Sequence, residues 1–148
     1  MTVDVTVSEV IEAPRTRVAQ FVMDHRNDPT WIGGISDSQL LGNQPFGVGS
    51  DVQRVASFVG RRIMYVNRVE ELEPDTRLVM RSVKSPFPMI VTYAFADVPR
   101  GRTRTSVRVQ GGPGVLCRIA GSLLEWQVRR SVTKDLRTLK GLMDSDTS

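Results

Sequence analysis

The stretch LCRIAGSLLEWQVRRSVTKDLRTLKGLM, residues 116–143, has the apolar spacing of one long amphipathic helix. Its apolar side chains recur every three or four residues on a single stripe, formed by Leu116, Ile119, Leu123, Leu124, Val128, Val132, Leu136, Leu139 and Met143. Most basic residues lie off this stripe, so the helix should turn a charged face to water. A helix of roughly 27 to 30 residues is about 40 to 45 Å long. It has to bury its stripe against an apolar surface that the rest of the chain supplies.

The middle of the chain, residues 35–111, has the pattern of an antiparallel sheet. It contains extended runs and no convincing amphipathic helix. We predict strands at residues 36–41, 50–59, 62–72, 76–83, 89–97 and 103–110. Turn sequences such as Gly60 and Glu73-Pro74-Asp75 separate neighbouring runs. Connections this short exclude parallel crossovers, so consecutive strands should pair antiparallel.

The first 34 residues predict one more strand and two short helices. Residues 3–11 alternate between apolar and polar side chains, as expected of a half-buried strand. Pro14 suits the first turn of one helix, and Asp28 with Pro29 begins a second that Gly33-Gly34 ends. The predicted fold class is α+β, with a curved seven-stranded antiparallel sheet wrapped around the long C-terminal helix.

Length and composition narrow the function classes. A chain of 148 residues is the size of one ordinary domain, and we expect residues 1–148 to form one ligand-binding unit. The single cysteine, Cys117, and single histidine, His25, provide neither a disulfide nor a zinc cluster. We expect no metal and no cofactor. The N-terminus lacks the features of a signal peptide, and no apolar stretch approaches membrane-spanning length, so we expect a cytoplasmic protein without a transmembrane segment.

A bent sheet and a straight helix cannot touch along their whole length, which leaves room for an apolar small molecule between them. Strand alternation and the start of the long helix nominate the residues that would line this cavity. They are Trp31, Tyr65, Asn67, Met80, Met89, Val91, Tyr93, Phe95, Leu116 and Ala120. Tyr65, Asn67 and Tyr93 are the polar members, and each can orient a carbonyl or hydroxyl group by hydrogen bonding.

Two charged residues fall on faces that alternation turns inward. Glu9 follows Val7 on the apolar face of its strand, where a carboxylate costs several kcal/mol unless it is paired. It is a candidate catalytic acid or base together with Tyr65 and Tyr93, unless the strand end turns it to water. Arg54 either recognises an anionic head group or extends from a sheet edge to water, and we favour the second.

Short motifs along the whole chain resemble the START-like (SRPBCC) superfamily and its polyketide cyclase and dehydrase family. They are IEAPRTRV at residues 11–18, FGVGS at 46–50, VEELEP at 69–74, YAF at 93–95 and LRTLK at 136–140. The resemblance implies a helix-grip fold and a hydrophobic ligand such as a lipid, a polyketide or a quinone. Because the motifs consist of packing and turn residues, they imply little about chemistry.

Three functions remain open at this point. We favour a carrier or binding protein for a hydrophobic small molecule. The first alternative is a cofactor-independent cyclase, aromatase or dehydratase, so enzymatic activity stays uncertain. The second is an interaction module that uses the basic residues Arg100, Arg102, Arg104 and Arg108. We expect no nucleic-acid partner, because aromatic residues that could stack on bases are missing from that stretch.

Overall fold

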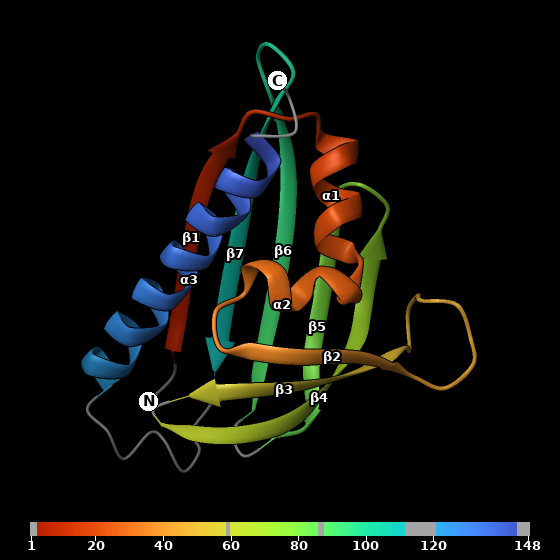
Figure 1. The fold of residues 1–148 in the computed structure, drawn as a ribbon, viewed down its shortest axis with the longest axis vertical. Helices are drawn as coiled ribbons and strands as arrows, with labels where there is room; N and C mark the ends of the chain where they lie inside the picture. Colours follow the sequence, from red (N-terminus) through yellow and green to blue (C-terminus); the bar gives the residue numbers. More distant parts are fainter. Residues whose placement is uncertain (1–2, 59, 86–87, 112–120, 145–148) are drawn as a thin grey trace.

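The computed structural model describes residues 3–58, 60–85, 88–111 and 121–144 (Figure 1). One seven-stranded sheet in the order β1-β7-β6-β5-β4-β3-β2 organises the fold. The strands are β1 (Val3–Ile11), β2 (Ile35–Leu41), β3 (Asp51–Phe58), β4 (Arg61–Glu73), β5 (Arg77–Lys84), β6 (Met89–Val98) and β7 (Arg102–Gly111). Every neighbouring pair is antiparallel, which confirms the predicted sheet.

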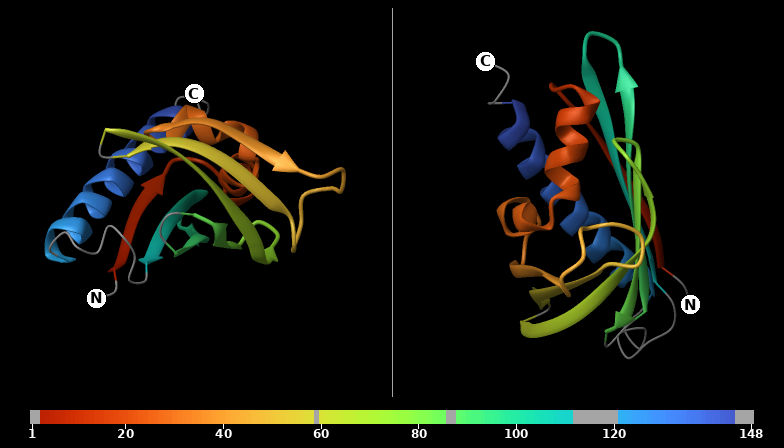
Figure 2. Two further views of the ribbon diagram at one scale, coloured as in Figure 1. Left: turned by 90° about the horizontal axis from the view of Figure 1, so that it is seen from below. Right: turned by 90° about the vertical axis from the view of Figure 1, so that its right-hand side faces the viewer.

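The sheet is strongly curved. Two of its strand pairs, β2 with β3 and β4 with β5, contain register shifts that help to bend it. The pairing of β4 with β5 shifts register twice, between Val66 and Asn67 and between Val69 and Glu71. Another shift lies between Ile35 and Asp37 in β2. An extra residue in one strand increases the local twist and bends the strand. The sheet therefore has a concave face, on which the helices lie (Figure 2).

Two short helices and one long helix cover the concave face. The short ones are α1 (Arg15–Met23) and α2 (Asp28–Trp31), joined by a 3₁₀ turn at His25–Asn27. The long one is α3 (Gly121–Asp144), which packs mainly on β1, whereas α1 packs on β6 and β7. These helices are as predicted. Leu116 and Ala120, assigned to the start of the long helix, lie outside the described residues.

The apolar stripe of α3 closes the core. Val132, Leu136, Leu139 and Met143 are buried there, against residues of the sheet and of α1. Replacing exposed apolar surface by such contacts is the main favourable term in folding. Among the described residues, no helix combines the length and apolarity needed to cross a bilayer.

Gly34 fixes the position of α2 against the sheet. Its φ of +87° belongs to the left-handed region, and an added Cβ would lie 2.8 Å from the carbonyl oxygen of Ser57. The Ser57 N–H donates a 2.8 Å hydrogen bond to the Gly34 carbonyl. Only glycine permits this close approach, which holds Trp31 over the concave face.

Candidate ligand-binding site

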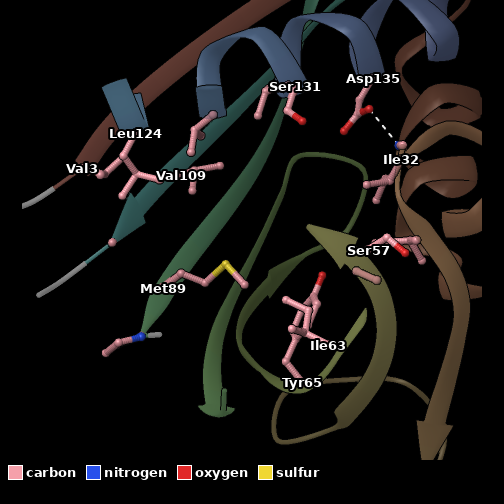
Figure 3. Close-up of a pocket in the computed structure, with 17 residues that line it drawn as sticks. Val3, Ile32, Ser57, Ile63, Tyr65, Met89, Val109, Leu124, Ser131 and Asp135 are labelled. Carbon is pink, nitrogen blue, oxygen red and sulfur yellow. Dashed lines mark hydrogen bonds between the residues drawn. The ribbon is translucent and has the colours of Figure 1, made fainter. Parts of the chain in front are cut away.

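A cavity of about 210 Å³ separates the N-terminal half of α3 from the sheet (Figure 3). Leu124, Val128 and Val132 line it from α3, and apolar side chains of β1, β4, β6 and β7 line it from the sheet. Its polar side chains are few: Ser57, Tyr65, Ser131 and Asp135. We call this space the outer chamber. Its lining is suited to hydrocarbon because apolar surface there gains by leaving water.

A second cavity of about 110 Å³ continues from the outer chamber toward α2. The two share the lining residues Ile32, Ile35, Tyr65, Val109, Val132 and Asp135. We call the second cavity the inner chamber. It adds Trp31, Arg54 and Tyr93, so polar groups gather at this end. The whole site is thus an apolar space with a polar inner end.

Arg54 is buried in the inner chamber and ion-paired with Asp28. Its Nε and Nη2 each lie 3.0 Å from Asp28 Oδ2, and Ser38 Oγ donates to the same oxygen at 2.8 Å. Only 6% of the Arg54 side chain and 1% of the Asp28 side chain are exposed. The favoured expectation that Arg54 extends to water is therefore wrong. Its partner comes from α2, which packs against β2 and α3.

Burial dominates the electrostatics of the inner chamber. It raises the pKa of Asp28, although Arg54 and Ser38 oppose the shift. Burial acts to lower the pKa of Arg54, but Tyr93, Asp28 and Tyr65 outweigh it and hold that pKa well above its usual value. Burial also raises the pKa of Tyr93 despite the nearby arginine. The Tyr93 hydroxyl is therefore neutral near pH 7 and is free to donate a proton to a hydrogen bond.

Trp31 has a further donor, which is buried beside the inner chamber. Its ring meets Tyr93 edge to face, with centroids 6.2 Å apart, and it is 3% exposed. Among the described residues, its Nε1 has no hydrogen-bond partner. Indole N–H and guanidinium groups donate only. A buried donor left alone is unfavourable, so the inner chamber is suited to a ligand with an acceptor oxygen.

Asp135 is the one carboxylate among the described residues that line the two chambers. Burial raises its pKa to about 6, against a hydrogen bond from the Gly33 N–H and the charge of Lys134. The Gly33 nitrogen lies 2.8 Å from Asp135 Oδ1, and a Cβ at Gly33 would lie 3.0 Å from that oxygen. Near neutral pH this group exchanges protons readily, as general acids and bases must.

We expect Asp135→Asn to stabilise the protein above pH 6 and to leave its stability nearly unchanged near pH 4. The folded-state pKa of about 6 lies above the ordinary aspartate value of 3.8, so the wild type loses stability as pH rises through 6. Asparagine removes the buried charge and keeps the oxygen that accepts from Gly33. Urea unfolding across this pH range measures the difference. Asp97→Asn, at a side chain that is 75% exposed, is the control. A gain that is equal at every pH contradicts the prediction.

The predicted lining residues divide into three groups. Trp31, Tyr65, Met89, Val91 and Tyr93 border the chambers, and as ligand contacts they stay predictions. The others that the structure describes do not border them: Asn67, Met80 and Phe95, which are buried in the core. Leu116 and Ala120 lie outside the described residues. The candidate base Glu9 is half-buried on β1 and borders neither chamber.

Two acidic residues of the site were absent from the sequence prediction. Asp28 looked like an ordinary helix start, and nothing local indicated that it is 1% exposed. Asp135 did leave a signal, because it follows Val128 by seven residues and Val132 by three and so lies beside the apolar stripe. Among the described residues, no cluster of three His, Cys, Asp or Glu side chains could hold a metal ion.

A curved antiparallel sheet that holds a long helix over an apolar cavity defines the helix-grip fold of START-like proteins. The chain belongs to the family described as polyketide cyclase / dehydrase and lipid transport, whose model matches residues 2–144. This confirms the resemblance found in the sequence. No curated protein is detectably similar to the chain.

Solved structures share this fold at low sequence identity. The Zhui aromatase/cyclase from Streptomyces sp. R1128 is 16% identical, with a TM-score of 0.83 over 100% of this chain and 97% of that one. A START superfamily protein from Mycobacterium smegmatis is 12% identical, with a TM-score of 0.84 over 96% and 97%. TTHA0849 from Thermus thermophilus is 16% identical, with a TM-score of 0.81 over 98% and 99%.

Proposed function

We propose that residues 1–148 act as one domain that binds a hydrophobic small molecule with an acceptor oxygen and serves as its carrier. The observation that carries this proposal is the division of the cavity into an apolar outer chamber and a donor-rich inner chamber. Hydrocarbon in the outer chamber supplies affinity through apolar burial. An oxygen in the inner chamber satisfies the Trp31 N–H and fixes the orientation.

The family description supports this ligand chemistry. It combines polyketide conversion with lipid transport, and both ligand classes join apolar carbon to carbonyl or hydroxyl oxygen. Small-molecule sites commonly combine apolar walls with a few fixed polar groups, and this cavity has the same composition. The carrier function requires only binding and release, for which these walls and donors suffice.

Native mass spectrometry and a pair of probes test the carrier function. We expect protein purified without additives to carry an apolar compound that organic solvent extracts. We also expect 2-naphthol to bind about tenfold more tightly than naphthalene, because one added hydrogen bond contributes about 1.4 kcal/mol. Isothermal titration measures both affinities.

Two variants control for the place of binding. Val128→Trp fills the outer chamber and should abolish binding of both probes, whereas Gln127→Trp puts the same ring on the exposed side of α3 and should not. Tyr93→Phe should reduce the preference for 2-naphthol. The carrier function is refuted if neither probe binds and no compound is extracted from the purified protein.

A second candidate function is a cofactor-independent cyclase or dehydratase. Asp135 favours it, since a carboxyl group with a pKa of about 6 lies where the two chambers meet. In this function Asp135 takes the role that the sequence suggested for Glu9. Its carboxylate removes a proton from a carbon flanked by carbonyls, and the enolate oxygen faces the donors of Trp31 and Arg54. The aromatase/cyclase with the same fold adds support.

A further inference from the structure

The outer side of α3 carries a tryptophan among four cations. Trp126, Arg129, Arg130, Lys134 and Arg137 are all exposed, and with Thr133 they line a groove of about 420 Å³. We call these five residues the cationic face. Because the cations are three, four, eight and eleven residues after Trp126, they lie with it on one side of the helix. In Figure 1 this helix lies in front of the sheet, with no described element in front of it.

In the described part of the chain, no carboxylate forms an ion pair with the cationic face, although the charge of Lys134 acts on the adjacent Asp135. No acidic side chain lines the groove, and among the described residues none of its four cations forms a salt bridge. Arg129 donates to the backbone carbonyl of Thr6, at 3.3 Å. Glu125, one turn before Arg129, forms no ion pair with it in the described part of the chain. The cationic face is thus a concentrated positive surface.

Several other basic residues of the chain are different, because carboxylates pair with them. On the sheet, Arg108 lies 2.8 Å from Asp4 and Arg68 lies 2.9 Å from Asp51. Arg102 lies 3.9 Å from Glu12. The stretch from Arg100 to Arg108, which the sequence suggested as an interaction surface, is therefore partly neutralised, and α3 is the stronger attractor for anions.

Trp126 identifies the kind of anion. It is 53% exposed, and the Arg130 guanidinium carbon lies 5.3 Å from its ring centroid. Tryptophan is favoured at the boundary between lipid headgroups and hydrocarbon, where its ring is apolar and its N–H remains hydrated. Flanking Lys and Arg attract anionic headgroups. Single-stranded nucleic acid is usually bound by several stacking aromatics, and this face has one.

We propose that the cationic face of α3 docks the protein on an anionic lipid bilayer. The helix lies parallel to the surface, with the four cations at the headgroup phosphates and carboxylates and Trp126 at the headgroup boundary. The opposite side of the same helix lines the outer chamber through Leu124 and Val128. Docking therefore brings one wall of the cavity to the membrane surface.

Vesicle sedimentation tests the docking. We expect the full chain to bind vesicles that contain about one third phosphatidylserine and to ignore vesicles of phosphatidylcholine alone. Binding should fall at least tenfold as salt rises from about 0.05 to about 0.5 M, because salt screens exposed charges. Trp126 emission should shift to the blue on binding, and Trp126→Phe should lose that shift.

Matched double variants separate the cationic face from net charge. Each cation contributes about a fivefold factor, so Arg130→Gln with Lys134→Gln should weaken vesicle binding about 25-fold. Arg100→Gln with Arg104→Gln removes the same charge from exposed positions elsewhere and should change binding less than about threefold. All four substitutions are on the surface, and thermal unfolding verifies the fold.

Three outcomes of the vesicle experiments would overturn the docking proposal. They are failure of the wild type to bind the anionic vesicles, equal losses in the two double variants, and an unchanged Trp126 emission on binding. Binding of a short RNA duplex in place of vesicles, with the same dependence on Arg130 and Lys134, would likewise overturn it and assign the face to nucleic acid.

Discussion

Arg54→Met is expected to lower the free energy of unfolding by about 3 to 5 kcal/mol near pH 8, because it leaves a buried carboxylate without its cation. Asp28 is 1% exposed and Arg54 is 5% exposed, so water cannot replace the lost ion pair. Methionine retains an unbranched chain of similar length, which limits the loss of packing. Urea unfolding measures the change.

The pH dependence of this loss identifies its cause. Burial already raises the pKa of Asp28 in the wild type, and removing Arg54 takes away an interaction that lowers it. The variant can neutralise Asp28 by binding a proton, so its deficit should shrink from about pH 8 to about pH 5. A deficit that is the same at both pH values would instead mean lost packing around the arginine.

Two further variants make the test quantitative. Asp28→Asn in the Arg54→Met background should restore much of the stability, since asparagine carries no charge and still accepts from Ser38. Arg68→Met breaks a pair with Asp51 in which the Arg68 side chain is 52% exposed, and should cost much less than Arg54→Met. Equal losses at Arg54 and Arg68 would contradict the buried ion pair.

Periodicity predicted which side chains face the concave surface. Once Val69 is assigned to the inner face of β4, strand alternation places Tyr65 and Asn67 with it. All three are buried, and so are Val132, Leu136, Leu139 and Met143 of the α3 stripe. These predictions succeed because each depends on the geometry of a single strand or helix.

Periodicity does not show which inward residues border empty space. Met80 and Phe95 share an inner face with Val91 and Tyr93, yet they are enclosed by the core where α1 covers the sheet. Glu9 is on an edge strand beneath α3 and away from both chambers. These differences depend on where the helices pack on the sheet. That packing cannot be predicted from any single segment of the sequence.

The Asp28–Arg54 pair could not be predicted for the same reason. Its partners are 26 residues apart and come from a short helix and a strand that meet only in the folded chain. Asp135 could have been predicted as a site residue, since its position beside Val128 and Val132 on the helix follows from spacing alone. A search for polar residues at the edge of the apolar stripe would have identified Asp135.

If the protein is a cyclase or dehydratase, Asp135→Asn should lower its turnover by about 10²- to 10⁴-fold, the usual contribution of a general base. The wild-type rate should rise with pH around 6, where the carboxylate forms, and the variant should lose this dependence. A linear poly-β-ketone is the probe, and the appearance of aromatic absorbance measures its cyclisation. Affinity for 2-naphthol should change less than about threefold, because asparagine retains the volume of the side chain.

Glu125→Gln is the matched control, since it removes a carboxylate from the same helix outside both chambers, and its turnover should equal that of the wild type. Wild-type turnover by the Asp135→Asn variant would rule out this carboxyl as the base. If the poly-β-ketone cyclises no faster with wild-type protein than in buffer while 2-naphthol still binds, the carrier function is favoured. The cavity then acts by holding its ligand, and the raised pKa of Asp135 reflects only the burial of its carboxyl group in the protein.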